Sequence, residues 1–207
     1  MTHRFSAWNW FRDACYVAWH RFDSVVFWSR VPDFAGLTVG LLGCVVLLGW
    51  LFDVAVLKSI HPAWVSMKAN TAIGFVLCGA ALCLKSDART SWRAAWPRVD
   101  SVLALAVFLL GLLNLFQYVS GTDLGVDQLL FQEPAGAVGT LAPGRMAPAT
   151  ALCFLFFGLA LMLDRHSART HLKTLLAIAT ALPALAGILG YLYHVPNLYG
   201  LGNKTQM

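Results

Sequence analysis

The sequence predicts an all-α fold: a polytopic membrane bundle of five transmembrane helices, preceded by an amphipathic helix. The first observation is composition, because 58% of the residues are hydrophobic and only 12% are charged, about half the charged share of a soluble domain. The second is that several charge-poor runs reach the length that crosses a bilayer. The third is an internal two-fold repeat, in which residues 67–84 and 146–163 align without a gap at an offset of 79 residues.

The repeat carries a regular stripe of residues. Thr71, Phe75 and Gly79 are four residues apart, and Thr150, Phe154 and Gly158 repeat that spacing. On a helix this spacing places a hydroxyl, a ring and a bare backbone on one face. We expect a helix-packing seam, since glycine allows close approach and threonine can hydrogen-bond between helices in a bilayer. A stripe that contacts a ligand is the alternative.

Residues 1–33 form a separate N-terminal segment rich in aromatic side chains. Hydrophobic residues recur at spacings of three and four, with polar residues on the other side, which predicts an amphipathic helix. Such a helix lies in the membrane interface or docks on a partner protein. The Val-Pro-Asp sequence at residues 31–33 is expected to end it. The predicted contact residues are Trp8, Phe11, Trp19, Phe22 and Trp28.

The membrane unit is expected to occupy residues 34–207. Glycines in the first span give it a flat face for close packing, and Pro183 is expected to kink the last span. The spans are predicted at about residues 34–57, 69–84, 101–119, 146–163 and 174–193.

Charge predicts the orientation of these spans. Eleven Lys and Arg residues fall in the N-terminal segment and two alternate loops, against four on the other side. This positive-inside bias predicts a bacterial inner-membrane protein with a cytoplasmic N-terminus and a periplasmic C-terminus. The net charge of +5 therefore indicates topology rather than a nucleic-acid partner.

Catalytic and metal-binding patterns are not evident in the sequence. It contains no phosphate-binding glycine loop, Cys-x-x-Cys pair or nucleophile elbow. None of the six histidines pairs with another at helical spacing within a span. We therefore expect a protein that is not an enzyme, without a metal site, and the sequence points to no particular cofactor.

Polar residues gather around the outer end of the third span and could form a ligand site. Carboxylates near the membrane surface can bind a cation or an amine, although such residues also cap helices and fix turns. An acidic residue near the end of the first span could join them or reach the headgroups. The candidates are Asp53, Asn114, Gln117, Tyr118, Asp123 and Asp127.

Three stretches resemble a known class of membrane region. Residues 111–131 read GLLNLFQYVSGTDLGVDQLLF, residues 143–154 read PGRMAPATALCF, and the tail contains GYLY followed by LYGLG. Over residues 62–207 this pattern is similar to the N-terminal multi-pass sensor region of PAS-containing bacterial histidine kinases and diguanylate cyclases. In those proteins a third Met-x-x-x-Thr-Ala helix follows the tail, whereas this sequence stops at Met207 and contains no PAS, kinase or cyclase sequence.

The resemblance implies a membrane sensory module that passes a signal to a cytoplasmic effector. The alternative is a structural accessory subunit that packs against a larger respiratory or photosynthetic membrane complex. The expected partners are the lipid bilayer and either another membrane protein or a further part of the same chain. We also expect an unfilled helix face beside the fourth and fifth spans, where a third repeat helix would pack.

Overall fold

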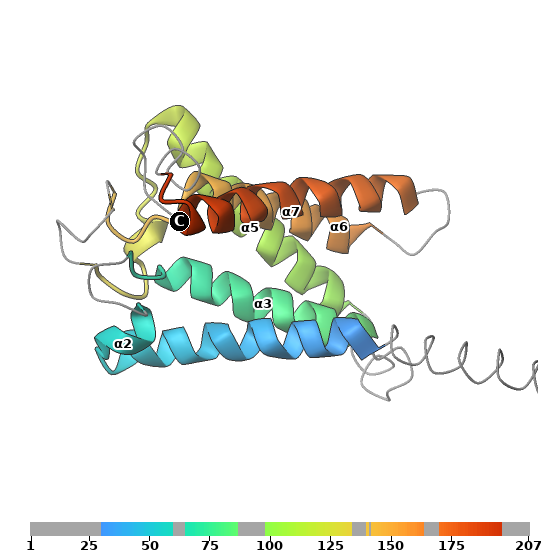
Figure 1. Ribbon diagram of the computed structural model, residues 1–207, viewed down its shortest axis with the longest axis horizontal. Helices are drawn as coiled ribbons and strands as arrows, with labels where there is room; N and C mark the ends of the chain where they lie inside the picture. Colours follow the sequence, from blue (N-terminus) through green and yellow to red (C-terminus); the bar gives the residue numbers. More distant parts are fainter. Residues whose placement is uncertain are drawn as a thin grey trace, which may run out of the picture.

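The computed structural model describes residues 30–59, 65–86, 98–133, 140, 142–163 and 170–195, and these residues form helices and no strand (Figure 1). The aromatic N-terminal contacts predicted at Trp8, Phe11, Trp19, Phe22 and Trp28 lie outside the described residues. The elements are the helix Arg30–Leu51, α2 (Ala55–Lys58), α3 (Ala69–Ser86), α5 (Val99–Ser120), the 3₁₀ turn η1 (Val126–Gln128), α6 (Pro148–Met162) and α7 (Thr170–Leu192).

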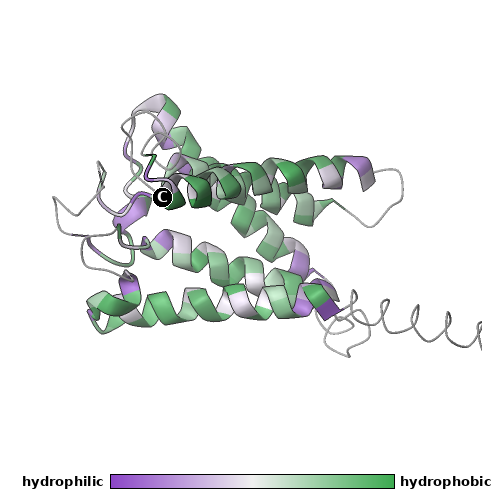
Figure 2. Ribbon diagram, in the orientation of Figure 1, coloured by the Kyte–Doolittle hydropathy of each residue, from purple (hydrophilic) through white to green (hydrophobic). Residues whose placement is uncertain are grey.

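Three of these helices are long and apolar enough to cross a membrane, namely Arg30–Leu51, α5 and α7. The two repeat helices, α3 and α6, are apolar but shorter. The 15 residues of α6 extend over about 22 Å at 1.5 Å per residue, less than the roughly 30 Å hydrocarbon core. Figure 2 shows hydrophobic residues along the helices and hydrophilic ones near their ends, which fits a helical membrane bundle.

The first long helix differs from its predicted bounds at both ends. It ends at Leu51 rather than near residue 57, because Asp53 adopts a left-handed φ of 55° and redirects the chain into α2. The Val-Pro-Asp sequence at residues 31–33 lies inside this helix, and the segment that it was predicted to end lies outside the described residues. Proline has no amide hydrogen to donate, and the first turn of a helix tolerates it for that reason.

Helix α6 begins at Pro148, two residues after the predicted start at Met146. Proline suits the first position of a helix, where its missing N–H would find no intrahelical acceptor. Met146 itself lies before the helix and is fully buried. At the other end of the chain, α7 continues from Thr170 to Leu192 with Pro183 inside it.

Glycines mark the closest helix contacts. A Cβ atom added at Gly79 would lie 2.4 Å from the carbonyl oxygen of Gly36, so α3 packs directly on the first helix. A Cβ atom added at Gly158 would lie 2.5 Å from the backbone nitrogen of Phe108, so α6 packs as closely on α5. In each repeat copy, therefore, the glycine of the stripe meets the backbone of the preceding long helix.

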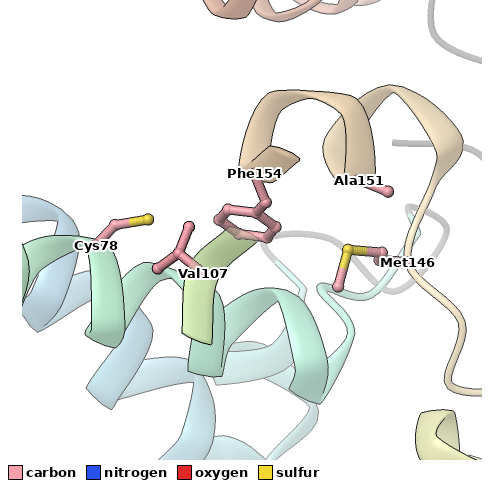
Figure 3. Close-up of a cluster of buried hydrophobic side chains, with 5 residues drawn as sticks. All are labelled: Cys78, Val107, Met146, Ala151 and Phe154. Carbon is pink, nitrogen blue, oxygen red and sulfur yellow. The ribbon is translucent and has the colours of Figure 1, made fainter. Parts of the chain in front are cut away.

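The core lies between α3, α5 and α6. Cys78, Val107, Met146, Ala151 and Phe154 form its main buried cluster, and Figure 3 shows the Phe154 ring extending from α6 toward Val107 of α5. The rings of Phe75 and Phe154 also meet edge to face, with centroids 5.9 Å apart. The two stripe phenylalanines therefore join α3 to α6 across the core.

Two ends of the molecule can be distinguished. We call the end where α5 stops and where α3 and α6 start the loop end, and the opposite end the far end. Figure 1 shows the first helix beside α3, on the opposite side of the bundle from α7, which packs mainly on α6. The first helix therefore does not cover α7, and much of the α7 surface is exposed.

Candidate ligand site at the loop end

Arg145 organises one half of the loop end. Its Nε donates to Asp127 Oδ2 at 2.7 Å, and its Nη2 donates to Gln117 Oε1 at 3.0 Å and to Asp123 Oδ1 at 3.5 Å. Asp127 and Gln117 are buried, whereas Asp123 is exposed. One guanidinium thus ties the segment that precedes α6 to the end of α5 and to the loop between them, as the fork of donors on arginine allows.

Lys68 and Glu133 form the second ion pair of the loop end. Lys68 lies directly before α3, and the two side chains are only 3% and 6% exposed as residues. Glu133 Oε2 also accepts from the backbone N–H of Gly144 at 2.7 Å, and Lys68 donates to Thr140. The pair therefore fastens the middle of the long loop to the start of α3.

Lys68 is held in an environment that opposes its charge. Burial lowers its pKa, while the hydrogen bond and the negative charge of Glu133 act in the opposite direction. The lowered pKa means that desolvation outweighs the attraction to Glu133. A buried ion pair of this kind depends strongly on both of its members being present.

Asn70, Asn114 and Gln117 add a buried layer of amides. Asn70 lies within 3.4–3.5 Å of oxygens of Val126 and Asp127, and Gln117 Oε1 accepts from the N–H of Leu124 at 2.9 Å. Asn114 Nδ2 donates to the Leu110 carbonyl at 3.1 Å. Among the described residues, Asn114 Oδ1 and Gln117 Nε2 find no partner although both are buried.

Two aromatic side chains bind equivalent backbone carbonyls in the two repeat copies. Trp50 Nε1 donates to the carbonyl of Met67 at 2.9 Å, and the Tyr118 hydroxyl donates to the carbonyl of Met146 at 2.8 Å. Met67 and Met146 occupy the same position in the sequence repeat. The start of each repeat helix is thus anchored by an aromatic residue at the end of the preceding long helix.

Two cavities lie against the Lys68–Glu133 pair. The smaller one, about 230 Å³, is lined by Val65, Ser66, Met67, Lys68, Thr71, Phe75, Ala147 and Thr150. The larger one, about 420 Å³, is lined by Trp50, Asp53, Lys58, Ser66, Leu130, Phe131, Gln132 and Glu133. Lys68 lines the smaller cavity and Glu133 lines the larger one, while Ser66 lines both.

Asp53 belongs to the larger cavity. It pairs with Lys58, whose ammonium also lies 4.6 Å from the centre of the Trp50 ring. The hydrogen bond and the positive charge of Lys58 lower the pKa of the Asp53 carboxyl. Because the Asp53 side chain is 92% exposed, this pair is screened by solvent and contributes little to stability.

The predicted candidates fall into two groups. Arg145 brings Gln117, Asp123 and Asp127 together. The centre of the Tyr118 ring lies 5.5 Å from the Cζ atom of the same guanidinium. Asn114 lies one helical turn before Gln117 on α5, while Asp53 contacts Lys58 instead. The carboxylates predicted to bind a cation thus already face cations of the chain, and no three His, Cys, Asp or Glu residues within the described segments cluster as metal ligands.

Four polar residues of this site were missed by sequence reasoning: Lys68, Asn70, Glu133 and Arg145. A signal for one of them was present, because Glu133 is the only glutamate in the chain and follows an apolar stretch of loop. Lys68 and Arg145 were counted only as charges of the outer segments. The repeat residues Thr71, Phe75 and Thr150 line the smaller cavity, whereas Gly79 and Gly158 lie at helix contacts.

Comparisons of the chain with protein-family models, with curated proteins and with solved structures give no match. The resemblance to sensor-kinase input regions therefore stays a prediction based on the quoted motifs.

Proposed function

We propose that this chain is a non-catalytic sensory module of the bacterial inner membrane, with its loop end toward the periplasm. The observation that supports this proposal is the pair of buried ionic contacts, Lys68–Glu133 and Arg145–Asp127, which hold the loop against the starts of α3 and α6. We call these two contacts the latch. A buried ion pair is either made or broken, which suits a two-state response to a signal.

Helix α3 connects the loop end to the far end and is the element through which we expect the signal to pass. At its start, Lys68 and Asn70 contact the loop, and at its other end Lys85 donates a hydrogen bond to the carbonyl of Leu161 on α6. Opening of the latch would remove contacts at the start of α3, and the end of α3 that is bonded to α6 would respond. We expect the signal to appear as a shift of α3 relative to α6.

Spin-label distances test this role. In a cysteine-free background, labels at residues 84 and 162 would report the separation of α3 and α6 at the far end. We expect Glu133→Gln, which breaks the latch, to shift or broaden this distance distribution, while Gln132→Ala at the exposed neighbouring position leaves it unchanged. Identical distributions for the parent and Glu133→Gln, in folded protein, would contradict a coupled sensory module.

The orientation has its own test. Leu129 is 77% exposed at the loop end, and Arg98 is exposed at the far end. In intact cells, a membrane-impermeant maleimide is expected to label Leu129→Cys and to leave Arg98→Cys unlabelled until the membrane is opened. The reverse pattern would overturn the proposed topology.

An accessory subunit is the second candidate, and the exposed face of α7 favours it. Leu175, Ile178, Leu182, Leu185 and Ile188 are 51–65% exposed on this helix, as a contact with lipid or with another membrane protein requires. Extraction from native membranes with a mild detergent distinguishes the two functions. A stable, stoichiometric large complex combined with unchanged far-end distances would favour the subunit.

A further inference from the structure

We propose that the smaller cavity is a binding site for a small organic carboxylate. The carboxylate oxygens would accept hydrogen bonds from the hydroxyls of Thr71 and Thr150 and from first-turn amides of α3 and α6. This inference rests on the proposed sensory function in one respect, because the bound carboxylate would be the signal that the sensory module detects. Binding itself can be measured whether or not a signal follows.

The first argument is that both hydroxyls are free to bind a ligand. Three other helical threonines donate their hydroxyls to the carbonyl four residues earlier: Thr38 at 2.8 Å, Thr174 at 3.1 Å and Thr180 at 2.8 Å. Thr71 and Thr150 make no hydrogen bond in the described part of the chain, although Thr71 is only 9% exposed. Its hydroxyl oxygen is not one of the fully buried atoms without a partner, so it is accessible from the cavity that Thr71 lines.

The second argument explains why these two differ. The carbonyls four residues before Thr71 and Thr150 belong to Met67 and Met146, and they already accept from Trp50 and Tyr118. Both methionines lie before their helices, so each threonine sits in a first helical turn, where no intrahelical carbonyl lies four residues earlier. The same arrangement occurs in both repeat copies, and both threonines line one cavity.

The third argument is electrostatic. Helices α3 and α6 both start beside this cavity, and the first amides of a helix have no intrahelical acceptor. The N-cap residue of α6, Ala147, supplies no side-chain bond to them. The charge of Lys68 is already paired with Glu133, so it is the two positive helix ends that favour an anionic oxygen over an ammonium group.

Size and lining narrow the ligand class. The volume of about 230 Å³ is below the roughly 300–1,000 Å³ of pockets for drug-sized ligands, so one ring or a short chain fits. Met67, Phe75 and Ala147 provide the apolar walls. The anion can come from solution, as a benzoate-sized acid, or from the bilayer, as the head of a fatty acid.

Calorimetric titration of the protein in nanodiscs tests the site directly. We expect benzoate to bind and benzylamine not to bind. Thr71→Val and Thr150→Val keep the side-chain shape and remove the hydroxyl, so each is expected to weaken benzoate binding about tenfold. The matched controls Thr38→Val and Thr180→Val, whose hydroxyls bond within their own helices, are expected to leave binding unchanged.

Decanoate placed in the nanodisc bilayer distinguishes the two sources. If decanoate displaces benzoate and binds more tightly, the site takes a fatty-acid head; if it does not compete, the site takes a soluble acid. Binding of benzylamine, absence of binding by both acids, or unchanged affinity in the two valine variants would overturn the proposal. Benzoate binding without a change in the far-end spin-label distance would leave the site intact and contradict the sensory function instead.

Discussion

Removal of one member of the Lys68–Glu133 pair provides the strongest test of the latch. Lys68→Met keeps the length and apolar stem of the side chain but leaves Glu133 buried without its cation. Glu133 would retain the Gly144 N–H at 2.7 Å and the Ser66 hydroxyl at 3.3 Å. These two neutral donors do not replace a cation, so we expect a large loss of stability.

The expected magnitude follows from the burial of both groups. At 3% and 6% exposure, the pair lies in the range where loss of one partner costs about 3–5 kcal/mol. Glu133→Gln leaves the Lys68 ammonium buried without its carboxylate in the same way. The double variant Lys68→Met with Glu133→Gln removes both charges, and we expect its loss to be at least about 2 kcal/mol smaller than the sum of the single losses.

Unfolding free energies measured by steric trapping in bicelles would give the complete double-mutant cycle. Lys58→Met with Asp53→Asn provides a matched control, because that pair includes a side chain that is 92% exposed and should show far weaker coupling than the buried pair. Additive losses at Lys68 and Glu133 would show that the two charges do not depend on each other, and would refute the latch.

Three further results are expected. Gly79→Ala should destabilise the protein by about 1–3 kcal/mol through overpacking, while Gly40→Ala, whose added Cβ would meet its nearest atom at 3.7 Å, should be nearly neutral in the same unfolding assay. Arg145→Lys should lose about 1–3 kcal/mol, because the ammonium cannot reach Asp127 and Gln117 together; equal stability would contradict the role of the fork. The pKa of Lys68 in the folded protein is lowered from 10.5, so between these two pKa values the unfolded chain binds more protons than the folded protein. The free energy of unfolding should therefore rise with pH in this window. This rise should disappear in Lys68→Met.

Composition and periodicity were sufficient to predict helices, because long charge-poor runs have few other ways to satisfy their backbone groups in a bilayer. The end of the first helix was beyond this reasoning. Residues 50–57 contain no Gly or Pro. A hydropathy pattern also cannot reveal that one residue, Asp53, adopts a left-handed backbone conformation. Aspartate adopts that conformation more readily than most residues, which is how Asp53 ends an apolar run that continues past it.

The candidate site was predictable only where it is local. Gln117, Asp123 and Asp127 lie within eleven residues of sequence, and a turn after α5 brings them together. Lys68 and Glu133 are 65 residues apart, and no periodic pattern relates two loops. The stripe illustrates the same limit, since spacing placed Thr71, Phe75 and Gly79 on one face of a helix but did not indicate that the threonine borders a cavity while the glycine meets a backbone.

The unequal lengths of the helices have a consequence for the surrounding lipid. Helix α7, with 23 residues, extends over about 34 Å, roughly 12 Å more than α6. The long helix α7 would set the hydrophobic thickness of the membrane around it, while the shorter α6 would begin within that thickness, directly after the buried residues 146–147. Acyl chains that are too long would immerse the ionic contacts at the loop end, and shorter chains would bring them to the headgroups. Bilayer thickness would then act as a mechanical control on the loop, independent of any dissolved ligand.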